Sequence, residues 1–211
     1  MSPRLRKDPL RKEAGDYHHG NLRRALLEAA IQLLEEGDDA FTMREAARRV
    51  GVDHRAAYKH FVDRDDVLAA VSTEAYLALV DAVRTELARI DETDGTARLL
   101  GIARAYLAFS ARAPGRYRLM TGSRLNDDGR FPDLEAAIDT AFRLVKHELE
   151  SGMKRGVFAE ADVLERTITL WASMHGMASL VIMRRIRVRR DLLPTFAERT
   201  IGCTIRGMLN K

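Results

Sequence analysis

Apolar residues recur three and four positions apart along most of this 211-residue chain, which is the period of one face of a helix. In the first third this pattern predicts three short helices, over residues 22–34, residues 43 to about 49 and residues 53 to about 61. The positions that mark longer helices are Leu68, Val71, Ala75, Leu79 and Ala82; Leu99, Ala103, Tyr106, Leu107 and Ser110, before Pro114; Leu134, Ile138, Ala141, Phe142, Val145 and Leu149; residues 167–183; and Leu193, Phe196, Ile201, Ile205 and Met208. There is no strand-like alternation and no internal repeat, so the predicted fold is all-α.

The first two short helices carry clear start and stop residues. Asn21 is a candidate N-cap of the first helix and Gly37 a stop. Thr42 and Glu45 have the spacing of a capping box, and Gly51 ends the helix that they begin. Two short helices joined across this glycine turn predict a helix-turn-helix.

Composition narrows the class of protein. An apolar fraction of 46% can fill a core, and no window approaches the roughly 20 apolar residues needed to cross a bilayer. The N-terminus is basic without an apolar stretch behind it, and the single cysteine, Cys203, cannot form an intramolecular disulfide. We therefore expect a soluble, cytoplasmic protein that is neither secreted nor embedded in a membrane.

Charge is only mildly positive, with a formal value of +4, so it does not identify a nucleic-acid partner alone. Its distribution is more informative, because five cations lie between residues 44 and 60 with two acidic residues among them. A second basic run, RRIRVRR, spans residues 184–190. It fits either a second binding patch or a solvated helix end.

The segment GVDHRAAYKHF, residues 51–61, concentrates polar chemistry on one predicted helix. Arg55 and Lys59 lie four positions apart on one face, and His54 and Tyr58 share the adjoining face. Arginine can hydrogen-bond guanine edges, while tyrosine, lysine and imidazole can reach phosphate oxygens. This combination favours contact with duplex DNA.

Other interpretations of the segment are weaker. No serine, cysteine or carboxylate stands in a recognisable catalytic motif nearby. His18 and His19 are adjacent and point apart in a helix, and His54 and His60 lack helical ligand spacing, so we expect neither a metal nor a cofactor. An ordinary amphipathic helix with exposed cations is the remaining alternative.

The N-terminal third resembles the DNA-binding domain of TetR-family transcriptional regulators, over YHHGNLRRALLEAAIQLLEEGDDAFTMREAARRVGVDHRAAYKHFVDRDDVLAAV. The specific matches are the Leu-Ala face of the first helix, Phe41-Thr42-Met43-Arg44, Ala46-Ala47, Gly51-Val52, Tyr58 and His60-Phe61. The resemblance implies that Tyr58 and His60 touch phosphates, that Thr42 and Arg44 approach the DNA backbone, and that Phe61 packs inside. Asp53 departs from the usual Ser or Thr, and Arg55 from a common small residue. The expected DNA-binding residues are Thr42, Arg44, His54, Arg55, Tyr58, Lys59 and His60.

The remaining chain resembles, more weakly, the tryptophan-histidine-glycine subgroup of C-terminal TetR domains, through RAPGRYRLMTG and WASMHGMASL. Trp171 and His175 lie one helical turn apart, so they form either a buried structural pair or the wall of a pocket. Several methionines fit either an adaptable cavity or ordinary core. The expected ligand-binding residues are Tyr106, Tyr117, Met120, Phe142, Trp171, Met174, His175 and Ala178.

The resemblance implies a homodimeric regulator, most simply a repressor that an apolar or amphipathic small molecule releases from a palindromic operator. An activator on the same fold is the alternative, and an all-α enzyme a more distant one. The expected domains are a basic arm (1–20), a helix-turn-helix DNA-binding domain (21–63) and a ligand-binding and dimerisation domain (64–211).

Dimerisation is also expected from apolar surface near the C-terminus. Residues 170–182 are apolar on more than one face, and a second stripe follows at Leu193, Phe196, Ala197, Ile201, Ile205 and Met208. One chain's interior does not easily cover both, which predicts a four-helix interface between two chains.

Overall fold

The computed structural model of the chain describes residues 22–122, 125 and 129–210, and the regular elements in these ranges are all helical. They are α1 (Leu22–Glu36), α2 (Met43–Val50), α3 (His54–Ala57), α4 (Arg64–Leu87), α5 (Gly95–Arg112), α6 (Pro114–Gly122), α7 (Pro132–Lys154), α8 (Val163–Ile182), the 3-10 helix η1 (Arg190–Leu192) and α9 (Leu193–Arg206). Phe158 and Leu209 form an isolated β-bridge. The predicted all-α fold is confirmed. None of the described helices is long and apolar enough to span a bilayer.

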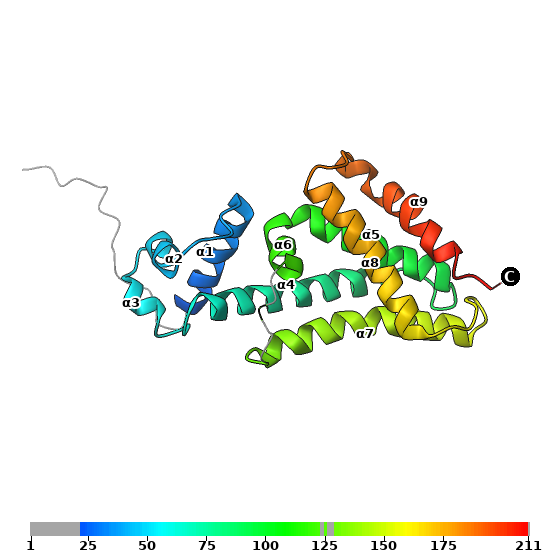
Figure 1. Cartoon of the computed structure of the whole chain (residues 1–211), viewed down its shortest axis with the longest axis horizontal. Coiled ribbons are helices and arrows are strands. Elements are labelled where there is room, and N and C mark those ends of the chain that lie inside the picture. The colour runs from blue at the N-terminus through cyan, green and yellow to red at the C-terminus, as the bar shows by residue number, and fades with distance from the viewer. Residues whose placement is uncertain (1–21, 123–124, 126–128, 211) are drawn as a thin grey trace, which may run out of the picture.

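The molecule is elongated, with α1–α3 at one end and α9 and the C-terminus at the other (Figure 1). We call α1–α3 the head and α5–α9 the body. Helix α4 connects them, because Val67, Leu68 and Val71 belong to the hydrophobic cluster of the head, whereas its later apolar residues belong to that of the body. The expected domain boundary at residue 64 coincides with the start of α4, but the two cores share this helix.

Local signals set the start and end of α2 as predicted. The Thr42 N–H donates to Glu45 Oε2 at 2.7 Å, and the Glu45 N–H donates to Thr42 Oγ1 at 3.2 Å, which completes the capping box. Gly37 and Gly51 have φ values of 92° and 80°, a region that glycine adopts without steric cost. The candidate cap Asn21 and the basic arm lie outside the described residues.

Helix α3 is shorter than predicted, since it ends at Ala57 and not near Phe61. Asp53 does cap it, accepting the Arg55 N–H at 2.8 Å. Beyond Ala57 the chain tightens into a turn, in which the His60 N–H donates to Ala57 O at 3.0 Å. This turn brings Phe61, only 1% exposed, into the head core, so burial of its ring ends the helix early.

Helix α6 was not predicted, because Pro114 looked like a stop signal. Proline also suits the first turn of a helix, where its missing N–H has no intrahelical partner. Here it begins α6, which packs against α1 so closely that a Cβ on Gly115 would lie 2.3 Å from Leu34 O.

The C-terminal stripe was misassigned. Leu193, Ala197, Ile201, Ile205 and Met208 are at most 5% exposed in a single chain, where α9 packs on α5 and α8. The premise that one chain cannot cover both stripes is therefore wrong for α9. Helices have several faces, and the sequence does not show which neighbour covers each one.

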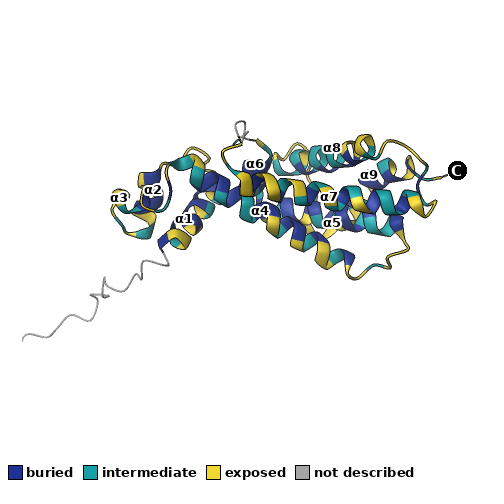
Figure 2. Cartoon of the chain, turned by 90° about the horizontal axis from the view of Figure 1, so that it is seen from below, coloured by how far each residue is buried: buried dark blue, intermediate teal, exposed yellow. Residues whose placement is uncertain are grey.

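Helix α8 does leave apolar surface uncovered. Leu170, Met174 and Ala178 are buried, but Leu164 and Ile168 are 50% and 53% exposed. Further exposed large apolar residues lie near the end of α8 and before α9: Leu180, Met183 and Leu192. Much of the outer side of α8 is accordingly teal or yellow in Figure 2, which marks intermediate and exposed residues.

Candidate nucleic-acid interface and adjoining hollow

The helix-turn-helix presents polar side chains on an exposed surface, while apolar residues such as Met43 and Phe61 are buried. Ala46, Ala47 and Ala57 are at most 1% exposed, so α2 and α3 pack closely on the rest of the head. Thr42 and Arg44 are exposed at the start of α2, where the resemblance places a backbone contact. The capping box fixes the position of this helix start.

Five of the expected residues lie on α3 and in the following turn. Arg55 and Lys59 are exposed, Tyr58 is 52% exposed, and His54 is half-buried with its ring edge-on to Tyr58 at 6.5 Å between centroids. Tyr58 and Lys59 lie in the turn and not on α3 itself, as does the half-buried His60. The turn nevertheless brings these side chains and Arg55 into one short exposed segment.

Most cations of this segment are not neutralised locally. Arg44, Arg55 and Lys59 have no carboxylate of a described residue within 4.0 Å, so they can offer their charges to a polyanion. Arg49 is different, because it forms two hydrogen bonds to Glu36, both at 2.7 Å. The exposed Arg48 also lacks such an ion pair; it was not among the predicted residues, although it follows Arg44 by one helical turn.

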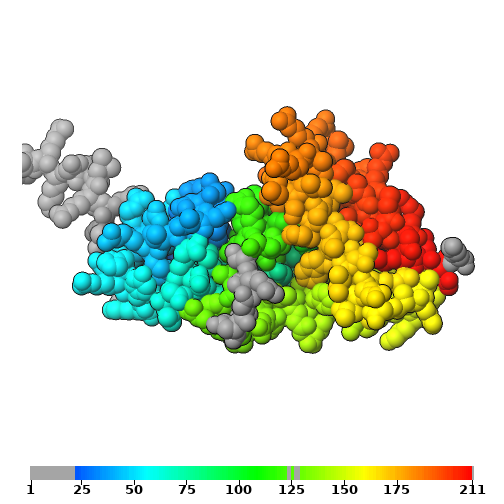
Figure 3. All heavy atoms as spheres, in the orientation of Figure 1, coloured from blue at the N-terminus to red at the C-terminus, as the bar shows by residue number. Residues whose placement is uncertain are grey.

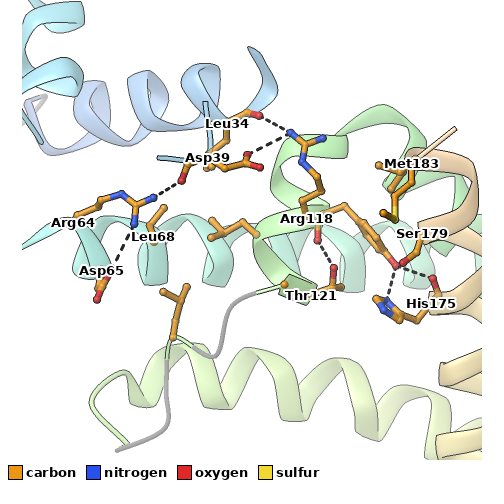
Figure 4. Close-up of a pocket in the computed structure, with 15 residues that line it drawn as sticks. Leu34, Asp39, Arg64, Asp65, Leu68, Arg118, Thr121, His175, Ser179 and Met183 are labelled. Carbon is orange, nitrogen blue, oxygen red and sulfur yellow. Dashed lines mark hydrogen bonds and ion pairs between the residues drawn. The ribbon is translucent and has the colours of Figure 1, made fainter. Parts of the chain in front are cut away.

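A hollow of about 660 Å³ lies between the head and the body (Figure 4). Its lining comes from α1, α4, α6, α8 and adjoining segments: Leu34, Asp39, Arg64, Asp65, Leu68, Tyr117, Arg118, Leu119, Thr121, Gly122, Leu125, His175, Ser179, Ile182 and Met183. The volume is within the range of small-molecule sites. Most of these residues were not predicted, because only the packing of α6 against α1 and α4, with the Tyr117 hydroxyl hydrogen-bonded to His175 of α8, brings them together.

The charges that line the hollow are balanced. Arg64 donates to Phe41 O at 2.8 Å. It also donates to Asp39 O, and Arg118 donates to Leu34 O at 3.1 Å (Figure 4). Two arginines therefore face two aspartates, and both guanidiniums are engaged with the head. The hollow suits an uncharged amphipathic molecule better than an anion.

Three of the predicted ligand-binding residues form a hydrogen-bonded chain that ends at the hollow. The hydroxyls of Tyr106 and Tyr117 are 3.2 Å apart, and the Tyr117 hydroxyl lies 2.8 Å from His175 Nδ1. Burial raises the pKa of both tyrosines, so both hydroxyls stay protonated at neutral pH. His175 is thus hydrogen-bonded and also lines the hollow.

The other predicted ligand-binding residues lie elsewhere in the body. Trp171 packs on Phe142 with 5.7 Å between ring centroids, and with Met174 and Tyr106 it lines a void of only about 20 Å³. Met120 accepts a hydrogen bond from the Tyr76 hydroxyl at 3.1 Å, and Ala178 is fully buried. The eight residues are therefore divided between the hollow and the packed core. Their role in ligand binding stays a prediction.

The head is held to the body at one end of the hollow. Glu35, in the last turn of α1, accepts the Gly115 N–H at 2.8 Å and the Arg116 N–H at 3.2 Å. These N–H groups belong to the first turn of α6, where a carboxylate is favoured. Movement of α6 would therefore be transmitted to α1.

Comparisons with known proteins match both parts of the chain. Residues 26–71 match the family described as bacterial regulatory proteins, tetR family, and residues 99–203 match the tetracyclin repressor-like C-terminal domain. The nucleoid occlusion factor SlmA of Photobacterium profundum is 31% identical over 185 residues, which cover 83% of this chain and 89% of that protein.

Solved structures share the whole arrangement of helices. A protein of unknown function from Rhodococcus sp. RHA1 superposes with a TM-score of 0.78 at 28% identity, covering 92% of this chain and 98% of the other. The TetR family transcriptional regulator PfmR from Thermus thermophilus has a TM-score of 0.67 at 21% identity, covering 86% and 97%. At that identity, the likeness to PfmR concerns the fold alone.

Proposed function

The chain belongs to the TetR family of bacterial regulatory proteins, and on that premise we propose that it is a cytoplasmic, homodimeric repressor that a small molecule releases from duplex DNA. The observation that carries the DNA-binding part is the helix-turn-helix with its exposed cations Arg44, Arg55 and Lys59, which have no carboxylate within 4.0 Å among the described residues. An activator would bind DNA with the same surface. A reporter gene placed behind the operator separates the two, since loss of the protein raises expression under a repressor and lowers it under an activator.

We assign base contact to Arg55 and backbone contact to the residues around it. Arg55 is exposed at the start of α3 and has the forked donor geometry that suits guanine. Thr42, Arg44, His54, Tyr58, Lys59 and His60 would contact phosphates, which position the protein without reading sequence.

The test begins with selection of an operator from a random DNA pool. Arg55→Ala should lower affinity for the operator by about 1 to 3 kcal/mol and relax preference at one base position. Tyr58→Phe should weaken operator and scrambled duplex alike. Arg89→Ala, an exposed arginine in the loop after α4, is the matched control. If Arg55→Ala lost equal affinity for operator and scrambled DNA, base contact by Arg55 would be disproved.

Dimerisation is assigned to the exposed outer face of α8. Leu164 and Ile168 are large and half exposed, and Gly176 has open space beside it, which permits close approach of a second copy. A single head covers few base pairs, so two copies on a two-fold axis supply the contacts of a roughly palindromic site.

Light scattering tests this assignment. Ile168→Asp should give a folded monomer with greatly weakened operator binding, whereas Leu77→Asp, at a 46% exposed leucine of α4, should remain dimeric. Ile201→Asp cannot serve, because Ile201 is 2% exposed and its change would damage the core of one chain. A wild-type monomer at micromolar concentration would contradict the proposal.

The effector site is assigned to the hollow between head and body. Its leucines offer apolar contact, while Tyr117, His175 and Ser179 offer hydrogen bonds. A ligand there could release DNA only by binding one arrangement of head and body more tightly than the other. The contact of Glu35 with α6 is a direct mechanical connection between them.

A filling substitution tests the hollow. A Cβ at Gly122 would meet no atom within 4 Å, and Gly122 lines the hollow, so Gly122→Trp should occupy the hollow without disturbing the core. The uncharged dye Nile red should bind the wild type and Gly122→Ser but not Gly122→Trp, and all three should bind the operator. Unchanged dye binding to a folded Gly122→Trp protein would place the site elsewhere.

A further inference from the structure

The connection between α8 and α9 forms a cationic surface that is separate from the helix-turn-helix. Residues 184–190, which we call the arginine loop, contain five arginines and no lysine or acidic residue. All five arginines are exposed. In Figure 3 the orange segment that includes this loop projects from the body.

Most of these guanidiniums have no ion-pair or hydrogen-bond partner in the described part of the chain. Arg189 pairs with Asp191, and Arg190 donates to Ala111 O at 3.4 Å. Arg184, Arg185 and Arg187 make no side-chain hydrogen bond or ion pair with any described residue. Three neighbouring charges are left for an external anion.

Stabilisation of the helix end does not account for the loop. The carbonyls at the end of α8 accept backbone N–H groups: Arg184 N–H reaches Val181 O at 3.1 Å, and Arg185 N–H reaches Leu180 O at 2.9 Å. This is the Schellman pattern of a helix C-terminus. The arginine side chains add no hydrogen bond to these carbonyls.

Arg184 occupies the position of that pattern where glycine is favoured. Its φ is 55°, and it is the one residue other than glycine with positive φ in the described part of the chain. A left-handed conformation is unfavourable for a residue with a Cβ. An arginine here therefore lowers local stability while it adds charge to the loop.

The chemistry of the loop favours phosphate on duplex DNA. Arginine presents a planar fork that matches two phosphate oxygens, whereas the loop has no aromatic ring on which the bases of a single strand could stack. Ile186 and Val188 are half-buried, so the loop presents guanidiniums and not an apolar edge for insertion into lipid. The position of the loop is also suitable for contact with DNA, because the preceding residues Ile182 and Met183 border the hollow shared with the head.

We propose that the arginine loop is a second, sequence-independent contact surface for the phosphate backbone of duplex DNA, separate from the α2–α3 surface. The choice of DNA among polyanions rests on the proposed function. The loop would strengthen binding to all duplexes and would increase its dependence on salt, since each phosphate contact releases counterions.

The test compares two triple variants of the full-length protein on operator and scrambled duplexes. Arg184→Gln, Arg185→Gln and Arg187→Gln together should lower both affinities by the same factor, on the order of 10- to 100-fold at ~0.1 M salt. The slope of log affinity against log salt should fall by about 2 to 3, because each lost contact removes about 0.9. The control combines Arg84→Gln, Arg89→Gln and Arg143→Gln, which make the same change in net charge on other exposed surfaces.

Equal effects of the two triple variants would overturn the proposal, since net charge alone would then explain the loss. A changed ratio of operator to scrambled affinity in the loop variant would also overturn it. So would unchanged DNA binding together with lost flotation on phosphatidylglycerol vesicles, which would identify a lipid surface. Failure of the proposed function would look different: selection would return no duplex that the wild type prefers to scrambled DNA, while the loop variant would still lose affinity for any duplex.

A single substitution gives a second test that does not depend on folding of the triple variant. Arg184→Gly should raise the melting temperature, because glycine relieves the left-handed conformation, and should lower affinity for both duplexes several-fold. A more stable Arg184→Gly protein with wild-type affinity and wild-type salt slope would contradict the proposal.

Discussion

The head and the body differ in what determines the packing of their helices. In the head, caps and turns close in sequence determine where helices begin and end, as Thr42 with Glu45 and Gly51 do for α2. In the body, the decisive contacts join distant segments, such as Arg98 of α5 with Glu148 of α7. Local signals are therefore sufficient to shape the helix-turn-helix, whereas the wall of the hollow depends on long-range packing.

Their ion pairs differ in the same way. Arg24 and Glu74, between the head and α4, are 54% and 37% exposed, whereas Arg98 and Glu148 are 12% and 7% exposed. Exposed pairs are screened by water and contribute little, whereas a buried charge that loses its partner is strongly unfavourable. The body should accordingly be more sensitive to loss of a single charge.

Arg98→Ala should give the largest effect, lowering the free energy of unfolding by about 3 to 5 kcal/mol, because Glu148 would be left buried and unpaired. Hydrogen bonds to Glu148 raise the pKa of Arg98, so its guanidinium stays protonated at neutral pH. Urea denaturation followed by circular dichroism measures the change. Arg24→Ala, the exposed control, should change stability by less than about 1 kcal/mol. Similar losses in the two variants would remove the distinction between head and body.

Gly115→Ala should rank next. It should lower the free energy of unfolding by about 1 to 3 kcal/mol, because its Cβ would lie 2.3 Å from the backbone oxygen of Leu34. Hydrogen exchange should quicken at the end of α1 and the start of α6. Gly152→Ala is the matched substitution in the body, where the Cβ meets the Phe158 ring, also at 2.3 Å. It should quicken exchange in α7 and leave α1 unchanged. Faster exchange of α1 in Gly152→Ala would show that the junction is not an independent contact.

Thr42→Ala should lower stability by about 1 kcal/mol, through loss of the capping box. Hydrogen bonds from Thr42 hold the pKa of Glu45 below its usual value. The contribution of that carboxylate is therefore present at neutral pH and is lost as the pH falls through its lowered pKa. Thermal unfolding at neutral and acidic pH checks both statements. Thr195→Ala, an exposed threonine of α9, is the control, and an equal change in it would disprove the role of the cap.

Ser72→Ala should have the smallest effect, an increase in the free energy of unfolding of less than about 1 kcal/mol. Its hydroxyl is buried and is the one buried side-chain polar atom without a hydrogen-bond partner in the described ranges. Ser110 is equally buried but donates to Leu107 O at 2.9 Å, so Ser110→Ala should instead lose about 1 kcal/mol. Calorimetry of the two variants compares them, and a clear loss in Ser72→Ala would show that its hydroxyl has a favourable contact.

Sequence periodicity predicted the helices that bury one continuous apolar stripe, and it failed where a proline or an aromatic residue had two possible roles. A helix was expected to end before Pro114, and α5 does end at Arg112, but this proline also begins α6. Phe61 was placed on α3 but ends it by entering the head core. At both positions the local structure depends on packing against a neighbouring helix. That information is not local.

The sequence by itself determined the all-α class, the helix-turn-helix and the candidate DNA-contacting residues, because caps, turns and helix faces depend on residues only a few positions apart. Only the tertiary structure decided that the α9 stripe is internal and that Leu34, Tyr117 and His175 border one hollow. Burial and pocket geometry depend on which helices meet, and helix α4 places its two groups of apolar residues in different cores. The sequence pattern shows that the apolar face of a helix must be buried, and only the tertiary structure determines which helix buries it.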